Sequence, residues 1–252
     1  MKPIASLLLA IMMLAIPAVM SQDAEHWISQ TKSDYYNGSY SLALDDIDQY
    51  LKINQTDTWA WSFRANLLKK MERYREAVES FDMLIALDSS HAEAYNDRAL
   101  ILAGGLNRDD EALASLEAAL QIEPFNANIW YNKGMVLEKM ERNNESLEAY
   151  RRAIDLDEDL DRAWFRQGHV LMRLGRNSEA LKCFQKAAQL DPANSLYQQS
   201  LQDMGALTMN DLDADGLAAN GLDANGLDMD DLAVDLQENM LDFSASSARP
   251  GR

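Results

Sequence analysis

Residues 161–194 read DRAWFRQGHVLMRLGRNSEALKCFQKAAQLDPAN, and the fold can be predicted from this segment. It predicts two short helices separated by Gly175, because apolar or small residues recur at helical spacing on both sides of that glycine. The first stripe is Trp164, Gly168 and Leu171, and the second is Ala180, Phe184 and Ala187. Asp191-Pro192 ends the second helix, since proline lacks a backbone N–H and restricts the residue before it.

The same unit recurs along the chain at a step of 34 or 35 residues. One marker is aromatic: Trp27, Trp61, Tyr95, Trp130 and Trp164. A second marker is small: Ala43, Ala77, Ala112, Ser146 and Ala180. Self-similarity at this period is typical of stacked helical hairpins, each too thin to bury its own apolar faces. The sequence therefore predicts an all-α solenoid of about five helix–turn–helix units.

A third recurring position predicts how the two helices of a unit approach each other. It is occupied by Thr31, Ala65, Ala99, Gly134 and Gly168. Small side chains at this position in the first helix allow the second helix to come close, while aromatic and leucine residues fill the space around it.

These units resemble the tetratricopeptide repeat, whose pattern is Trp-x2-Leu-Gly-x2-Tyr, then Ala-x3-Phe, then Ala and Pro. The fifth unit matches most fully, through Trp164, Gly168, Leu171, Ala180, Phe184, Ala187 and Pro192. The third unit has an extra residue in its turn, and the first has Gln55 where proline is usual. The resemblance implies a right-handed α-solenoid with repeats at 22–57, 58–91, 92–126, 127–160 and 161–194.

The resemblance also implies a binding groove, formed in this family by the concave face of the first helix of each repeat. Carried over to this chain, the groove and its border comprise Trp59, Phe63, Asn66, Lys70, Tyr131, Asn132, Arg162, Phe165, Arg166, His169 and Arg173. Aromatic and basic side chains on one face suit an extended peptide with acidic and apolar residues. Within this set, Asn132, Arg162 and Arg166 form a candidate anion-binding patch. They match only half of the carboxylate clamp of chaperone-binding members.

Catalysis and cofactor binding have little support in the sequence. His26, His91 and His169 lie in different repeats, and no nucleophile motif, phosphate loop or metal-ligand spacing occurs. Cys183 is the one cysteine and occupies a site that is small in neighbouring units, so we expect a buried thiol. The formal net charge of -18 argues against nucleic-acid binding, and no basic run suggests a lipid surface. We therefore expect another protein or a peptide as the partner.

The N-terminal residues predict export. A lysine precedes an apolar run over residues 4–20, and Ser-Gln-Asp follows it, as in a secretory signal cleaved before Gln22. An uncleaved membrane anchor is the alternative. Either reading makes the protein secreted or held at the cell surface. Three glycosylation sequons begin at Asn37, Asn54 and Asn144.

After the repeats we expect a capping helix over 195–207 and an acidic low-complexity tail over 208–252. Five-residue repeats in the tail carry leucines at a step that fits neither a helix nor a strand. Asp211, Asp213, Asp215 and Gly216 open like a calcium loop, but Leu222 stands where its closing Glu belongs. A fragment of pentapeptide-repeat coil is a further alternative. Residues 231–243 instead predict a short amphipathic helix, which in isolation would form only transiently.

The sequence thus predicts an extracytoplasmic, non-enzymatic scaffold that binds a peptide or helix of a partner in the groove. One alternative makes the acidic tail the functional element, binding cations or a partner, with the repeats as a spacer. Another is self-association, in which the tail occupies the groove of its own or a neighbouring chain.

Overall fold

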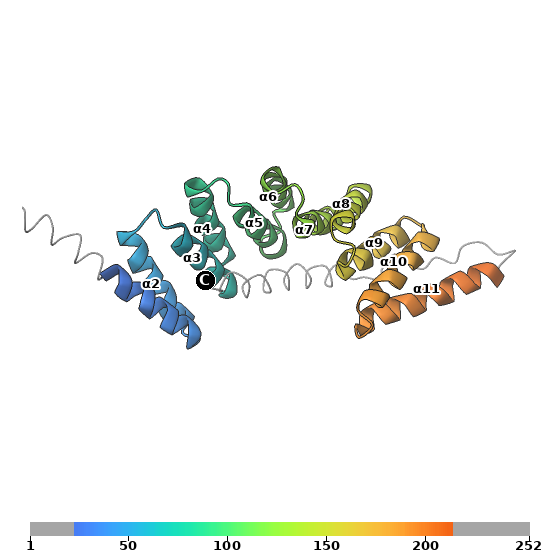
Figure 1. The fold of residues 1–252 in the computed structure, drawn as a ribbon, viewed down its shortest axis with the longest axis horizontal. Coiled ribbons are helices and arrows are strands. Elements are labelled where there is room, and N and C mark those ends of the chain that lie inside the picture. Colours follow the sequence, from blue (N-terminus) through green and yellow to red (C-terminus); the bar gives the residue numbers. More distant parts are fainter. Residues whose placement is uncertain (1–22, 214–252) are drawn as a thin grey trace, which may run out of the picture. The chain divides into compact units, whose positions relative to one another are not determined.

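A computed structural model describes residues 23–213, which form eleven helices and no strand (Figure 1). The described chain divides into two compact units, one ending at Ser89 and one beginning at Ser90. None of the described helices is long and apolar enough to cross a membrane. The predicted signal segment over 1–21 lies outside the described residues.

The first unit consists of four helices. They span residues 23–36, α2 (Tyr40–Ile53), α3 (Thr58–Lys70) and α4 (Tyr74–Leu87). α3 packs against both α2 and α4. Its core is formed by fully buried side chains that include Ile47, Leu68 and Phe81.

The second unit consists of seven helices in which each packs against the next (Figure 1). They are α5 (Ala92–Gly105), α6 (Asp109–Ile122), α7 (Ala127–Lys139), α8 (Asn143–Leu156), α9 (Asp161–Arg173), α10 (Asn177–Leu190) and α11 (Ser195–Asp213). Further contacts join α5 to α7 and α7 to α9, which are the first helices of successive repeats. α11 packs on α10 and extends beyond residue 207, where the capping helix was expected to end.

The recurring small position does what the sequence predicts. A Cβ built on Gly168 would lie 2.7 Å from a ring carbon of Phe184, and one on Gly134 would lie 2.5 Å from the ring of Tyr150. Both distances are far shorter than carbon–carbon contact distances, so only glycine admits the second helix at this separation. The aromatic ring of the second helix therefore fills the space that a side chain on the first would occupy.

The turn inside each repeat has a left-handed residue. Positive φ angles occur at Gly38, Glu72, Asn107, Glu141 and Gly175, each just after the first helix of its repeat. In three of these turns an arginine N–H bonds to a carbonyl five residues back, as when Arg176 donates to Leu171 over 2.9 Å. These bonds satisfy carbonyls at the helix end that would otherwise lack partners.

The third repeat absorbs its extra residue inside this turn. Arg108 N–H bonds to the carbonyl of Leu102 over 2.8 Å, six residues back instead of five, and Asn107 carries the positive φ. α6 nevertheless has the same 14-residue length as α4, α8 and α10. The insertion thus changes the turn and leaves the second helix intact.

In four of the repeats, the residue just before the second helix is an arginine that pairs with a glutamate three residues later. The pairs are Arg73–Glu76, Arg108–Glu111, Arg142–Glu145 and Arg176–Glu179. Hydrogen bonds from the guanidinium lower the pKa of each of these glutamates. The glutamates also lie in the first turn of the helix, so their negative charge interacts favourably with the helix dipole and stabilises the helix.

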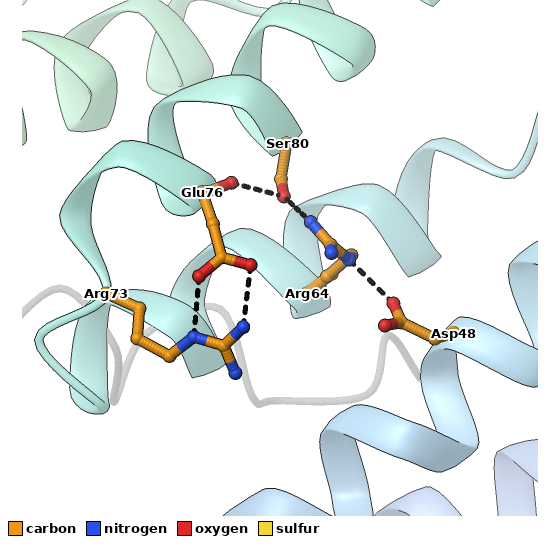
Figure 2. A network of polar contacts seen from close by, with 5 residues as sticks. All are labelled: Asp48, Arg64, Arg73, Glu76 and Ser80. Carbon is orange, nitrogen blue, oxygen red and sulfur yellow. Dashed lines mark hydrogen bonds and ion pairs between the residues drawn. The ribbon is translucent and has the colours of Figure 1, made fainter.

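In the first unit, polar contacts also link three successive helices (Figure 2). Arg64 of α3 donates to Asp48 of α2 over 2.7 Å and to the hydroxyl of Ser80 of α4 over 2.6 Å. Ser80 in turn donates to the main-chain carbonyl of Glu76, and the side-chain carboxylate of Glu76 accepts from the guanidinium of Arg73. One half-buried arginine therefore joins α3 to the helices on both of its sides.

Candidate functional site

Residues of the predicted groove fall in both units. Trp59, Phe63, Asn66 and Lys70 lie on α3, Tyr131 and Asn132 lie on α7, and Arg162, Phe165, Arg166, His169 and Arg173 lie on α9. α3 belongs to the first compact unit, and α7 and α9 belong to the second.

On the first unit, α3 contributes to a cluster of aromatic rings and lysines. We call it the aromatic–lysine cluster, and it consists of Lys32, Tyr35, Tyr40, Trp59, Phe63 and Lys70. Ring centroids of Trp59 and Phe63 lie 5.3 Å apart, and those of Phe63 and Tyr35 lie 5.4 Å apart. Such offsets are typical of aromatic pairs that attract each other beyond simple burial.

Two lysines lie over the rings of this cluster. Lys32 Nζ is 5.4 Å from the Trp59 ring, and Lys70 Nζ is 5.1 Å from the Tyr40 ring and 5.7 Å from the Tyr35 ring. Both lysines are exposed, and Trp59 keeps 40% of its surface in solvent. The cluster therefore presents apolar surface and positive charge together.

Asn66, the remaining groove residue predicted on α3, lies outside this cluster. It is only half-buried, and its amide nitrogen donates to the carbonyl of Ser62.

On the second unit, most of the predicted groove residues are buried. Tyr131, Asn132, Phe165, Arg166 and His169 are buried, whereas Arg162 and Arg173 are half-buried. The family pattern identifies the helix face on which these residues lie, but it carries no information about what packs over that face. A partner reaching this face would meet Arg162 and Arg173 first, because these two side chains keep exposed surface.

Several of these residues bond to the same face of the preceding repeat. Asn132 donates to Asn96 over 2.8 Å, and Arg162 donates to Asn128 over 2.5 Å. Arg173 pairs with the buried carboxylate of Glu138. The guanidinium of Arg162 also lies 4.8 Å from the Tyr131 ring centroid. These side chains thus help to hold successive repeats together, in addition to any role in binding.

Glu138 is the centre of this arrangement. Besides Arg173, it receives the hydroxyl of Tyr150 over 2.7 Å. Burial is the largest cause that raises the pKa of Tyr150, and the charge of Glu138 adds to it. Tyr150 therefore stays protonated and donates to a carboxylate that is itself paired, so its hydroxyl has no features of a catalytic base.

His169 is the exception, because neither of its ring nitrogens has a hydrogen-bond partner among the described residues. Its ring packs edge-on against Phe165, with centroids 4.5 Å apart, and against Phe184 at 4.8 Å. Burial, followed by the charges of Arg166 and Arg173, lowers the pKa of His169 to about 3. The imidazole is therefore neutral at physiological pH in this environment, with a donor and an acceptor both unused.

The sequence analysis did not identify two kinds of residue and one surface hollow. Lys32, Tyr35 and Tyr40 belong to the most divergent repeat, where the family pattern was weakest. The arginine–glutamate pairs follow the repeat period, so their Arg-x2-Glu spacing was a signal that could have identified them. A surface hollow of about 780 Å³ lies elsewhere on the first unit, between residues that include Asp48, Trp61, Arg64 and Met83.

The described residues contain no group of three or more histidine, cysteine or carboxylate side chains able to hold a metal ion. Cys183 is buried and its thiol donates to Gln167 over 3.2 Å. The predicted calcium loop and amphipathic segment concern side chains outside the described ones.

Comparison with known proteins identifies the family. Models of the tetratricopeptide repeat match residues 64–127, 127–160 and 161–194, which together span just over half of the chain. No curated protein matches the chain by sequence.

Solved structures match over most of their own length. A MamA protein matches with 20% identity and a TM-score of 0.63, covering 70% of this chain and 96% of its own. MamA from Desulfovibrio magneticus RS-1 matches with 22% identity and a TM-score of 0.63, covering 69% of this chain and 97% of its own. YrrB, described as a TPR protein with an unusual peptide-binding site, matches with 27% identity and a TM-score of 0.54. The match covers 79% of this chain and 97% of YrrB. The helix pairs, their stacking and these matches together show that the chain belongs to the tetratricopeptide repeat family, whose members act as protein-interaction scaffolds.

Proposed function

We propose that this protein is an extracytoplasmic scaffold that binds a peptide or helix rich in acidic and apolar side chains. The observation that carries this proposal is the aromatic–lysine cluster, where exposed Trp59 lies beneath Lys32 in a chain of formal net charge -18. Tryptophan is enriched among the interface residues that contribute most binding energy, so an exposed tryptophan beside a cation suits a binding surface. YrrB, a similar repeat protein, is described by its peptide-binding site, which supports the same class of ligand.

The acidic preference follows from charge. Lys32 and Lys70 are exposed cations next to rings, so an incoming carboxylate would be attracted and an incoming ammonium repelled. An apolar side chain of the ligand would cover the remaining surface of Trp59 and Phe63. Basic peptides of equal length would lose the attraction to the two lysines and keep only the apolar contact with the rings.

A peptide array tests this proposal on the full-length protein. The array carries matched acidic, neutral and basic versions of the same apolar peptides. We expect acidic versions to bind the wild-type protein, and the double variant Trp59→Ala/Lys70→Glu to lose at least tenfold in affinity, about 1.4 kcal/mol. The matched control is Phe125→Ala, which removes another exposed aromatic residue of 81% exposure far along the sequence. Binding of basic peptides, or loss of binding in the control alone, would contradict the proposal.

The extracytoplasmic part of the proposal is supported by the apolar run over residues 4–20. It needs a separate test, in which a C-terminally tagged chain is expressed and fractionated. We expect the tag outside the cytoplasmic fraction and a mature N-terminus at Gln22. A tag found wholly in the cytoplasm would remove this part and leave the peptide-binding proposal standing.

A further inference from the structure

The outward side of the second helices changes its charge along the chain. In each repeat, three residues at i, i+3 and i+4 of the second helix are neighbours on this side, and none of them is buried. In chain order they are Asp45, Asp48 and Gln49; Glu79, Asp82 and Met83; Ala114, Glu117 and Ala118; Glu148, Arg151 and Arg152; and Lys182, Gln185 and Lys186. Their formal charges sum to a negative value on α2, α4 and α6, and to a positive value on α8 and α10.

The acidic end of this series lies on the first unit. We call Asp45, Asp48, Glu79 and Asp82 the acidic surface, and they come from α2 and α4, which both pack against α3. Asp45, Glu79 and Asp82 are exposed, and Asp48 is half-buried. The carboxylates of Asp48, Glu79 and Asp82 also line the surface hollow of about 780 Å³. The hollow is therefore bordered by negative charge.

Apolar side chains and two cations complete most of the lining of this hollow. The apolar ones are Leu51, Trp61 and Met83, of which Met83 keeps 43% of its surface in solvent. Both cations, Arg64 and Lys52, already donate to neighbouring side chains, as Figure 2 shows for Arg64. Apolar surface beside carboxylates suits a lysine or arginine side chain, because its aliphatic stem packs on the apolar part while its charge stays near the carboxylates.

The basic end of the series lies on the second unit. We call Arg151, Arg152, Lys182 and Lys186 the basic surface, and they come from α8 and α10, which both pack against α9. Arg152 and Lys182 are exposed, and Arg151 donates to Glu148 of its own helix over 2.7 Å. The basic surface thus presents long cationic side chains at repeat positions that are acidic in the first unit.

The two surfaces are built alike and have opposite charge. Each is formed by two second helices that share one first helix as a neighbour. The charge is also reversed at the next turn, where α2 carries Lys52 and α8 carries Asp155. Because every copy of the chain carries both surfaces, the acidic surface of one copy is complementary to the basic surface of another. The formal net charge of -18 repels other copies, but at physiological ionic strength salt screens this repulsion beyond about 8 Å, so contacts at short range decide.

We propose that the acidic surface of one copy of this protein binds the basic surface of a second copy, with a lysine or arginine of α8 or α10 entering the hollow. Each exposed charge pair stabilises such a contact only weakly, so the association depends on several pairs acting together with the apolar contacts in the hollow. The interface shares no residue with the aromatic–lysine cluster, and it does not depend on the proposed function.

The solution mass of the full-length protein tests this association. Sedimentation equilibrium at about 0.15 M salt should give a mass above that of one chain. About 1 M salt should weaken the association at least tenfold, because the exposed charge pairs are screened. Association through the apolar run over residues 4–20 would not be weakened by salt in this way.

Charge reversal at exposed positions gives the decisive variants. Asp45→Lys/Glu79→Lys makes the acidic surface basic, and Arg152→Glu/Lys182→Glu makes the basic surface acidic. Each variant alone should sediment as a single chain. A one-to-one mixture of the two should associate, because every contact between them again joins opposite charges, and no change in net charge alone explains such a rescue.

The control variant is Glu25→Lys/Glu123→Lys. It changes the net charge by as much as the reversal of the acidic surface, at two exposed positions outside both surfaces. We expect it to associate like wild type. Circular dichroism should show the same helix content for all variants, since every changed side chain is exposed.

A crosslinking measurement locates the contact. A carbodiimide joins a carboxylate directly to a lysine amine, so it should link Asp45 or Glu79 to Lys182 or Lys186. In a mixture of nitrogen-15-labelled and unlabelled chains, mass spectrometry should find linked peptides with one member from each kind of chain. Links formed only within single chains would contradict the contact between copies.

Other results would also overturn the inference. They are a mass of one chain under all these conditions, association that persists in both charge-reversal variants, and a mixture that fails to associate. A single chain that binds lysine-rich apolar peptides through the hollow would assign the acidic surface to a different basic protein, and would overturn the second copy as its occupant. The peptide array on the aromatic–lysine cluster decides the proposed function separately from all of these results.

Discussion

The ring of Phe184 lies where a side chain on Gly168 would have to be, with only 2.7 Å between a built Cβ and the nearest ring carbon. Gly168→Ala should therefore destabilise the chain by about 1–3 kcal/mol, although alanine favours a helix by about 1 kcal/mol over glycine. Denaturant unfolding followed by circular dichroism measures this change. In Gly205→Ala, where a built Cβ meets nothing within 4 Å, the same substitution should instead stabilise α11. Equal effects at the two positions would contradict the close approach.

The left-handed turn residues give an opposite pair of predictions. Glu141 is exposed and has a φ of 57°, which costs a non-glycine residue about 1–2 kcal/mol. Glu141→Gly should raise the melting temperature, and Gly175→Ala, at a φ of 70°, should lower it. Thermal melts of both variants beside wild type decide the matter. A lower melting temperature for Glu141→Gly would mean that its side chain contributes more than its backbone costs.

The thiol of Cys183 should resist alkylation in the folded protein. It is buried, and burial raises its pKa to about 11, so at pH 8 little reactive thiolate is present or accessible. Mass spectrometry after iodoacetamide treatment should show modification only as denaturant opens α9 and α10. As a control, Gln185→Cys in a Cys183→Ala background places an exposed thiol on the same helix and should react at once. Fast reaction of native Cys183 would show that this region opens readily.

Stability should fall on mild acidification because of His169. Its pKa is about 3 in the described fold but near 6.5 in an unfolded chain, so below pH 6.5 the unfolded state binds a proton that the folded state does not. The loss should approach about 1.4 kcal/mol at pH 5.5.

Urea unfolding at pH 7.5, 6.5 and 5.5 gives the slope of the unfolding free energy against pH, and His169→Gln should flatten this slope. His26→Gln, which changes an exposed histidine, should leave it unchanged. A slope that survives His169→Gln would assign the effect to other groups.

Repetition explains which parts of this structure could be predicted. Five copies of one pattern average out local ambiguity, so the helix pairs and the close approach at Gly134 and Gly168 followed from spacing alone. The predicted groove residues of α9 lie together on one helix face, but the sequence could not show that Arg166 and His169 are buried. Burial depends on what packs against a side chain, and the His169 ring lies against Phe165 and Phe184 of its own repeat. Bonds such as Arg162–Asn128 and Asn132–Asn96 join neighbouring repeats at separations of 34 and 36 residues, which the sequence pattern does not show.

The aromatic–lysine cluster was predicted only in part for a related reason. Trp59, Phe63 and Lys70 lie at positions that the family pattern identifies, whereas Lys32 and Tyr35 come from the first repeat, which departs most from that pattern. A terminal repeat has solvent on one side and is under weaker packing constraint. Its surface residues are therefore free to vary, and the pattern cannot identify them.

The turn of the third repeat has an evolutionary consequence. The bond from Arg108 to Leu102 spans one residue more than its counterparts, and α6 keeps its full length. A codon gained at this point therefore adds a residue to the turn and leaves the helix that follows unchanged. Length changes in descendants of this gene should therefore accumulate in the turns between paired helices, and the helices themselves should change by substitution alone.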